Sequence, residues 1–302
     1  MNVSIIIVNY NTTSLLQQCV DSIVKHTHGV SYEIIVVDNG STEDSLIPLR
    51  QDQRIHLLEQ HENLGFGRAN NVGAAKAKGE HLFLLNPDTI LLNDAVSFLY
   101  KHLVDTPRTG LCGGNIYDGD MTPIHSHDQL FPSILSELDT VFGHLYYKLK
   151  YGKNSWFNHT GKPIKVAMIT GADMMIRRTV WEKVGGFDPS FFMYYEDSDL
   201  CARIKKLGFD IINVPQAEII HLEGKSFNES KSRCQRYFCG RSNYFHKHYS
   251  ASYNRMADLL NITTLETACL ICRLTNKKQA FSKYLLRLQV YQELINNPNS
   301  AL

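Results

Sequence analysis

The stretch Ser4-Ile5-Ile6-Ile7-Val8-Asn9 decides the fold of this 302-residue chain. Its centre is a continuous apolar run rich in β-branched residues, and similar apolar runs occupy residues 34–37 and 82–85. A strand that is apolar on both faces is typical of a parallel sheet covered by helices. We therefore expect three buried, parallel strands in the N-terminal part of the chain.

Helical patterns lie between and after these runs. Apolar residues recur at helical spacing over residues 15–24, and further helices are expected over residues 70–78 and 94–103. Residues 108–165 are irregular and predict a long connection. After it we expect short helices at residues 179–184 and 197–207 and a strand at residues 210–214. The alternation of strand and helix predicts a doubly wound α/β fold.

A polar side chain follows each of the three apolar runs. Asn9 follows the first, Asp38 the second and Asn86-Pro87-Asp88 the third. In open parallel sheets, ligands bind outside the carboxyl ends of the strands, so these side chains are expected to converge on a ligand. The Asp88 carboxylate suits a divalent cation and the Asp38 carboxylate suits a ribose or a nucleobase. Each also fits a plain turn, in which Asp88 caps the next segment and Asp38 closes an Asx turn.

Composition and charge exclude several classes of protein. The 31 Lys and Arg residues against 30 Asp and Glu residues give a net charge of +1, so no global field recruits nucleic acid. The start of the chain lacks the features of a secretory signal, and no apolar run approaches the ~20 residues of a membrane span. Seven scattered cysteines are typical of a reducing compartment. We expect a cytoplasmic protein, either free or bound peripherally at the inner face of the plasma membrane.

The run Phe191-Phe192-Met193-Tyr194-Tyr195-Glu196-Asp197-Ser198-Asp199 places three carboxylates directly after five aromatic or apolar residues. A carboxylate beside an apolar wall has a perturbed pKa and suits a general base. The structural alternative is a helix start, where free N–H groups and the helix dipole stabilise carboxylates. That alternative explains one carboxylate better than it explains three.

Two further motifs allow a functional and a structural interpretation. Asn63-Leu64-Gly65-Phe66-Gly67-Arg68 is no dinucleotide fingerprint, because Asn70 stands at the third glycine position. It predicts a glycine-rich approach to a helix with Arg68 available for a nucleotide, or only a capping loop. His221 follows an expected strand and suits a metal or phosphate contact, although a lone histidine is more often structural. Gly224-Lys225-Ser226 lacks the upstream glycine of a Walker A loop.

We divide the chain into an α/β domain at residues 1–230 and a C-terminal helical segment at residues 231–302. Residues 231–254 are rich in Arg, Lys, Tyr and Phe. They predict either a peripheral membrane surface that docks a lipid-linked molecule or a helix that packs its aromatic side chains on the α/β domain, and the second is favoured. Residues 259–271 and 284–295 predict further amphipathic helices, which suit formation of a homodimer.

Taken together and in this order, the motifs resemble those of family 2 glycosyltransferases of GT-A fold, especially bacterial rhamnosyltransferase-like enzymes. The matching stretches are residues 3–11, 35–41, 63–73, 84–88, 171–172, 185–188, 191–200 and 221. The resemblance implies that residues 1–230 form a nucleotide-sugar-binding and catalytic domain of GT-A fold, followed by the C-terminal helical extension.

The resemblance also implies roles for individual residues, one position at a time. The expected nucleotide-binding residues are Asn9, Asp38, Asn63, Arg68 and Asn86. Asp88 and His221 would hold Mg²⁺ or Mn²⁺, although Asn86 replaces the first aspartate of the family's metal motif. Asp197 would be the catalytic base with Glu196 beside it, and Tyr195 and Asp199 would contact the acceptor.

The reaction implied by the resemblance is metal-dependent, inverting transfer of a hexosyl unit, with rhamnose as the family preference. The donor would be a nucleoside-diphosphate sugar and the acceptor a glycan or a lipid-linked sugar in cell-surface polysaccharide biosynthesis. A nucleotidyltransferase is one alternative, but it would need a basic glycine-rich loop where Asn9-Tyr10-Asn11 stands. A catalytically weak nucleotide-sugar-binding module is another, against which Asp88, Asp197 and His221 argue.

Overall fold

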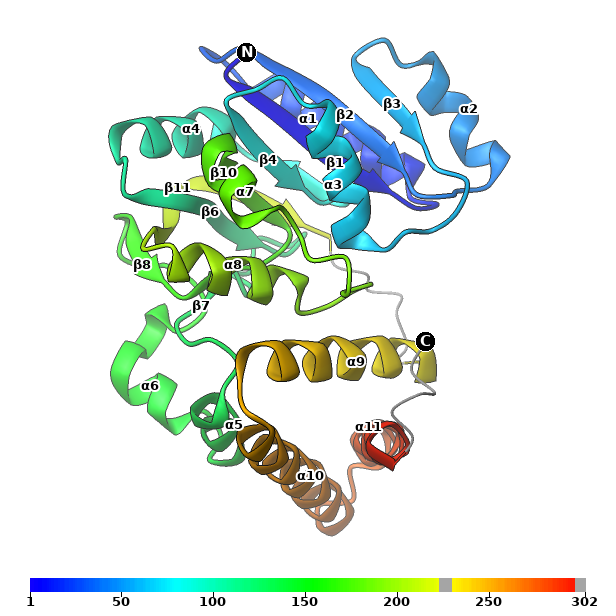
Figure 1. The fold of residues 1–302 in the computed structure, drawn as a ribbon, viewed down its shortest axis with the longest axis vertical. Coiled ribbons are helices and arrows are strands. Elements are labelled where there is room, and N and C mark those ends of the chain that lie inside the picture. The colour runs from blue at the N-terminus through cyan, green and yellow to red at the C-terminus, as the bar shows by residue number, and fades with distance from the viewer. Residues whose placement is uncertain (223–229, 297–302) are drawn as a thin grey trace.

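One mixed β-sheet organises the α/β part of the molecule (Figure 1). The structure is a computed structural model that describes residues 1–222 and 230–296, so Gly224-Lys225-Ser226 lies outside the described residues. Within these ranges the sheet has nine strands in the order β3-β2-β1-β4-β10-β6-β11-β5, and β8 pairs with β11. Their bounds are Val3–Asn9 (β1), Tyr32–Asp38 (β2), Ile55–Glu59 (β3), His81–Leu85 (β4), Thr89–Leu91 (β5), Thr109–Tyr117 (β6), Ile164–Val166 (β8), Asp173–Arg177 (β10) and Asp210–His221 (β11).

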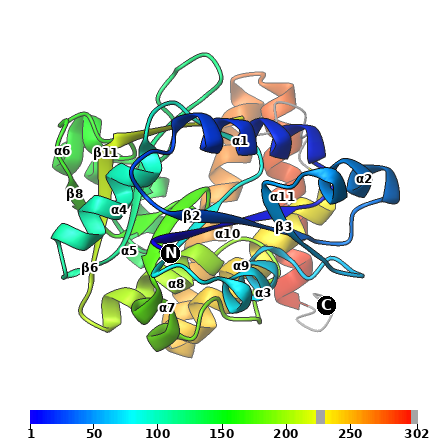
Figure 2. The same cartoon turned by 90° about the horizontal axis from the view of Figure 1, so that it is seen from above.

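The part of the sheet nearest the N-terminus is parallel, as the apolar runs predict. β1 pairs with β2 on one side and β4 on the other, and Asn9 lies opposite Asp38 in the register. β3 adds a fourth parallel strand at the edge. The connecting helices are Thr13–His26 (α1), Glu43–Gln51 (α2) and Phe66–Lys76 (α3). Seen from above, α1 covers one face of these strands and α3 the other (Figure 2).

The other part of the sheet departs from parallel alternation. β10 runs antiparallel between β4 and β6, and β11 is parallel to β6 but antiparallel to β5 and β8. The prediction of an irregular connection over residues 108–165 is wrong, because this stretch contains β6 and several helices. It holds Ile134–Val141 (α5), Leu145–Tyr151 (α6) and Gly152–Asn154 (η1), while His127–Asp128 (β7) pairs with Met168–Ile169 (β9). The α/β class is confirmed.

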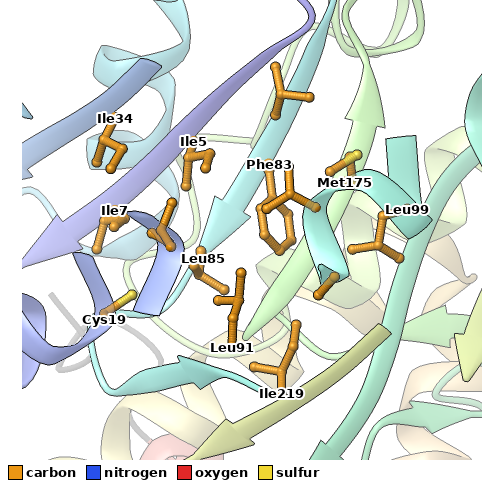
Figure 3. Packing of buried hydrophobic residues seen from close by; sticks show 14 of the residues in the cluster. Ile5, Ile7, Cys19, Ile34, Phe83, Leu85, Leu91, Leu99, Met175 and Ile219 are labelled. Atoms are coloured by element: carbon orange, nitrogen blue, oxygen red, sulfur yellow. The ribbon is translucent and has the colours of Figure 1, made fainter. Parts of the chain in front are cut away.

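Two apolar layers sandwich the sheet and fix the positions of its strand ends. Alternate side chains of β1 enter opposite layers: Ile5 and Ile7 enter one and Ile6 the other. Figure 3 shows Ile5, Ile7 and Phe83 in the first layer. Full burial of such a side chain stabilises the fold by about 1.5–3 kcal/mol. Three more helices complete the layers, Ala95–Asp105 (α4) in the first, and Arg178–Val184 (α7) and Glu196–Lys206 (α8) in the second.

Helices beyond residue 230 form the expected C-terminal extension. They are Lys231–His248 (α9), Ala251–Leu274 (α10) and Lys278–Asn296 (α11). α9 buries Tyr244 and Phe245 against Phe191 and Ala202 of the α/β domain, as the packing interpretation of residues 231–254 predicts, whereas its Phe238 packs with the other C-terminal helices. The guanidinium of Arg241 is buried and forms ion pairs with Glu137 of α5 and Asp258 of α10, each at 2.9 Å. Among the described helices, none combines the length and apolar character needed to cross a membrane.

Candidate active site

The acidic run starts helix α8 from an unusual turn. Tyr194 and Tyr195 have φ angles of +71° and +68°, and a non-glycine residue in this region costs roughly 1–3 kcal/mol. Gly240 of α9 packs against the carbonyl of Tyr194 so closely that a Cβ there would lie 2.3 Å from the oxygen. Packing of the C-terminal extension therefore supports the turn that places Glu196 and Asp197 in a cavity wall.

Glu196 and Asp197 differ sharply in their hydrogen bonds. Asp197 Oδ1 accepts a bond from the backbone N–H of Ser198 at 2.6 Å, and Oδ2 accepts one from the N–H of Gly171 at 3.2 Å. Glu196 is buried, and its Oε2 has no hydrogen-bond partner among the described residues. Hydrogen bonds to a carboxylate favour its ionised form, whereas burial without them favours the protonated form.

The surroundings therefore shift the pKa values of the two carboxyl groups to different extents. Burial, with the neighbouring Asp197 charge as a second cause, raises the pKa of Glu196 to about 8. Burial also raises the pKa of Asp197, but its bonds from Ser198 and Gly171 oppose that rise. These effects make Asp197 the more acidic of the two carboxyl groups, so the negative charge of the pair lies mainly on Asp197. Of these two groups, Asp197 is the better candidate for accepting a proton.

A two-residue segment connects Asp197 to the polar end of β4. Gly171 donates its N–H to Asp197, and the carbonyl of the next residue, Ala172, accepts the N–H of Asn86 at 3.0 Å. The proton acceptor and the Asn86-Pro87-Asp88 turn are therefore held on the same short stretch of backbone. Asn86 and Asp197 both line the cavity.

Asn86, Asp88 and His221 meet at the ends of β4 and β11. The Nε2 atom of His221 lies 3.1 Å from Asp88 Oδ1 and 3.3 Å from the side-chain nitrogen of Asn86. A carboxylate, an imidazole and an amide are a reasonable partial ligand set for Mg²⁺ or Mn²⁺. Within residues 1–222 and 230–296, no three His, Cys, Asp or Glu side chains are grouped to hold a metal ion. Asp88 and His221, with the Asn86 amide, fit part of the ligand set of such a cation, and further ligands would have to come from outside these residues.

Asn9 and Asp38 meet at the ends of β1 and β2, as their register requires. The side-chain nitrogen of Asn9 donates to Asp38 Oδ1 at 2.8 Å, and the backbone N–H of Ser41 donates to Oδ2 at 2.9 Å. The second bond reaches three residues along the chain, one further than in the Asx turn expected from the local sequence. Asp38 is buried, so the structure places it beneath the surface of the strand ends, with the turn after β2 above it.

Asn63 and Arg68 flank the start of α3 and hold it against the acidic turn. Asn63 Oδ1 accepts the N–H of Gly65 at 2.9 Å, and Phe66 donates its N–H to the carbonyl of Phe192 at 3.0 Å. Arg68 donates from Nε to the carbonyl of Pro189 at 2.8 Å. Among the described residues, no side chain caps the N-terminus of α3, whose N-cap is Gly65. Arg68 retains further N–H donors on an exposed guanidinium.

A cavity of about 740 Å³ lies between the α/β domain and the C-terminal helices. It brings together five of the predicted site residues, namely Asn86, Tyr195, Glu196, Asp197 and His221. Asn9, Asp38, Asn63, Arg68 and Asp88 are not among its lining residues within the described part of the chain. Asn9, Asp38 and Asp88 lie instead at the adjacent strand ends, and Asp88 contacts His221 of the cavity wall. Asn63 and Arg68 lie at the start of α3.

Asp199 occupies a different place from the other two carboxylates. It is fully buried and lies 2.8 Å from Arg203 on its own helix and 2.8 Å from both Lys247 and His248 of α9. Burial acts to raise its pKa, but His248, Lys247 and Arg203 lower the pKa below its ordinary value. Its position does not support the predicted acceptor contact. Asp199 instead anchors α9 to α8.

Several cavity residues were not identified from the sequence. His125 and Asp128 lie 3.1 Å apart in one wall, and Arg233, Lys283 and Arg287 come from α9 and α11. The basic side chains belong to a segment rich in Arg and Lys, but only the packing of α9 and α11 shows which of them face the cavity. The local sequence does not predict β7 or the position of Asp128 in the cavity wall, because this strand is only two residues long.

The fold and the site together define a glycosyltransferase of the GT-A class. The chain belongs to glycosyl transferase family 2, whose family model matches residues 4–185. A second family model, described as the N-terminal domain of galactosyltransferase, matches residues 154–225. The family and fold class expected from the sequence motifs are confirmed.

Relatives with assigned activities include rhamnosyltransferases. The N-acetylglucosaminyl-diphospho-decaprenol L-rhamnosyltransferase of Mycobacterium tuberculosis is 29% identical over 64% of this chain and 67% of its own length. Rhamnosyltransferase WbbL of Escherichia coli is 28% identical over 72% of this chain and 83% of its own length. The y4gI protein of Sinorhizobium fredii is 29% identical over 74% of this chain, but the match spans only 25% of that longer protein.

Solved structures show the same fold. A mannosyltransferase from Pyrobaculum calidifontis in complex with GDP-Man and Mn²⁺ matches with a TM-score of 0.57 at 16% identity, covering 97% of this chain and 85% of that chain. GalNAc-T7 with UDP, GalNAc and Mn²⁺ matches with a TM-score of 0.58 at 18% identity, covering 81% of this chain and 50% of that chain.

Proposed function

We propose that this glycosyltransferase moves a hexosyl unit from a nucleoside-diphosphate sugar to an acceptor hydroxyl with inversion at the anomeric carbon. The observation that carries the proposal is the short backbone link between Asp197 and Asn86 through Gly171-Ala172. This link supports an arrangement in which the Asp197 carboxylate lies near the strand-end residues that would bind a diphosphate. Inversion would require attack and departure on opposite faces of the sugar ring.

The donor nucleotide would occupy the carboxyl ends of β1, β2 and β4. Asn9 and Asp38 would set the shape of the nucleoside pocket, and Asn63 would fix the loop that covers it. Arg68 would contact the nucleotide from the start of α3, where the helix dipole also favours negative charge. Asn86 would orient the diphosphate.

Asp88 and His221 would hold a divalent cation on the donor diphosphate. Bound there, Mg²⁺ or Mn²⁺ supplies positive charge that stabilises the diphosphate as it leaves. The mannosyltransferase and GalNAc-T7 structures of the same fold both contain Mn²⁺. Asn86 in place of a second carboxylate leaves this site with one formal charge fewer, so we expect modest metal affinity without the nucleotide.

Asp197 would act as the general base. Its carboxylate accepts the proton of the acceptor hydroxyl while that oxygen forms a bond to the anomeric carbon, and the bond from this carbon to the diphosphate oxygen breaks with its electrons on the leaving group. Glu196, whose pKa burial raises to about 8, would leave the negative charge of the pair mainly on Asp197. General-base catalysis of this kind is typically worth ~10²–10⁴-fold.

The acceptor would lie against Tyr195 in the cavity, and we propose a lipid-linked sugar as its class. Arg233, Lys283 and Arg287 put three basic side chains in the same cavity as the base, which suits an acceptor that carries phosphate groups. The Mycobacterium relative acts, by its name, on a diphospho-decaprenol-linked sugar. Rhamnose is the proposed donor sugar, in a pathway of cell-surface polysaccharide synthesis.

A panel of nucleotide sugars tests this function. Each sugar nucleotide, dTDP-rhamnose included, is incubated with the protein with and without Mn²⁺, and thermal shift and release of nucleoside diphosphate are measured. We expect one donor to raise the melting temperature and to be hydrolysed slowly in a metal-dependent manner. Absence of both responses across the panel would contradict the proposal, and hydrolysis of nucleoside triphosphates instead would favour a nucleotidyltransferase.

A further inference from the structure

Helices α5 and α6 lie in the lower part of the molecule in Figure 1, away from β3 and α2. They carry an exposed apolar face. Its large apolar side chains are between 36% and 79% exposed, and Phe142 and Leu149 are the most exposed of them. We call this set the α5–α6 face; its members are Leu135, Leu138, Phe142, Leu145 and Leu149. Leu135, Leu138 and Phe142 follow helical spacing, as do Leu145 and Leu149, so each helix presents one apolar stripe.

The acidic and basic side chains of α5 and α6 differ in their exposure to solvent. Both acidic side chains of α5 point inward: Glu137 pairs with the buried Arg241, and Asp139 is buried beside His144. The basic side chains Lys148, Lys150 and Lys153 are exposed. The surface of these two helices therefore combines protruding apolar side chains with exposed lysines, whereas the acidic side chains of α5 are directed into the protein.

Tyrosines add an amphipathic rim to the face. Tyr146 and Tyr151 follow the same helix as Leu145 and Leu149, and Lys150 lies over both tyrosine rings at 5.1 Å. Tyrosine is favoured where an apolar phase meets water, and a lysine can keep its charged end in water while its stem covers apolar surface. This combination matches an anionic membrane interface.

We propose that the α5–α6 face binds the surface of an anionic membrane. A second copy of this chain is a poorer partner, because a twofold interface would bring the same lysines together from both copies. The face is also connected to the cavity: Pro132 lines the cavity, and α5 begins two residues later with Ile134, whose N–H donates to Tyr253 at 2.8 Å. Membrane contact here would bring the acceptor side of the cavity close to lipid.

This location differs from the one predicted from sequence, which was residues 231–254. α9 buries Phe238, Tyr244 and Phe245 within the protein, whereas the leucines of the α5–α6 face remain exposed to solvent. The proposal goes beyond transferase activity and does not depend on the identity of the donor sugar, so its test needs no substrate.

Vesicle co-sedimentation of the full chain tests the proposal. Wild type is expected to bind vesicles of phosphatidylcholine mixed with phosphatidylglycerol, and to bind less at high salt. Phe142→Asp and Leu149→Asp should each weaken binding at least about tenfold, since each removes an apolar side chain from the lipid contact. Lys148→Gln should weaken it about fivefold, with no effect on vesicles of phosphatidylcholine alone. Ile47→Asp on α2 replaces an equally apolar, exposed side chain elsewhere and should bind as wild type.

Circular dichroism and sedimentation velocity complete the experiment. All four variants replace exposed side chains and should keep the wild-type spectrum. No binding of wild type to anionic vesicles, or equal binding by Leu149→Asp and wild type, would overturn the proposal. So would a wild-type dimer that Leu149→Asp converts to monomer, because the face would then be an interface between two copies.

Discussion

Replacing Glu196 by glutamine should make the protein more stable at alkaline pH while leaving its stability at acidic pH nearly unchanged. Burial raises the pKa of this carboxyl from an ordinary 4.5 to about 8 in the folded protein. The folded state therefore holds the proton more tightly than the unfolded state. The stability that the protonated group contributes is fully present below about pH 4.5 and is lost as pH rises to about 8.

The size of the effect follows from the shift. At about 1.4 kcal/mol per pKa unit, the rise corresponds to roughly 5 kcal/mol as an upper value, reached when the pH exceeds the folded-state pKa. Glutamine has a similar shape and no proton to lose, so Glu196→Gln avoids this loss. The difference in unfolding free energy between the variant and wild type should grow between about pH 5 and about pH 9.

Urea unfolding followed by tryptophan fluorescence measures this difference. Glu182→Gln, which changes an exposed glutamate on α7, is the matched control and should show no comparable growth with pH. A constant difference between Glu196→Gln and wild type across the pH range would refute the assignment of the proton to Glu196. It would also remove the argument that the negative charge of the pair lies mainly on Asp197.

Three other predictions concern metal binding and packing. Asp88→Ala should abolish the Mn²⁺-dependent part of nucleotide affinity, and calorimetry that shows the same metal dependence in variant and wild type would contradict this. Arg241→Met should destabilise the protein by about 3–5 kcal/mol because it removes the buried cation that pairs with Glu137 and Asp258; adding Glu137→Gln should recover part of the loss, and full additivity would argue against the pair. Gly65→Ala should lower the urea midpoint clearly, since φ is +83° and a Cβ would lie 2.2 Å from the carbonyl of Phe192; an unchanged midpoint would show that this contact is loose.

The sequence predicted the parallel part of the sheet because its signal is local. The apolar runs of β1, β2 and β4 are uninterrupted, and one polar residue marks each end. β6 escaped prediction because glycines interrupt its apolar pattern. The structure shows why they are there: a Cβ at Gly110 would lie 2.8 Å from Phe209, and one at Gly114 would lie 2.4 Å from the carbonyl of Ala217. Close packing requires glycine at these positions, and without their side chains the sequence lacks the apolar pattern that predicts a strand.

In the candidate site too, features set by neighbouring residues could be predicted from the sequence, whereas contacts between distant parts of the chain could not. The acidic run and the polar strand ends are local, and the structure places Asp197, Asn86 and His221 around one cavity. The different role of Asp199 depends on Lys247 and His248, which lie far along the chain and reach it only through the packing of α9. The basic wall of the cavity depends on the same packing.

The most direct test of the central claim compares transfer and nucleotide binding in Asp197→Asn. The change keeps the shape of the side chain and removes the ability to accept a proton. With the donor that the nucleotide-sugar panel identifies, we expect turnover to fall by roughly 10²–10⁴-fold while the dissociation constant of the nucleoside diphosphate stays within about twofold of wild type. Turnover above about a tenth of the wild-type value would contradict the role of Asp197 as the base.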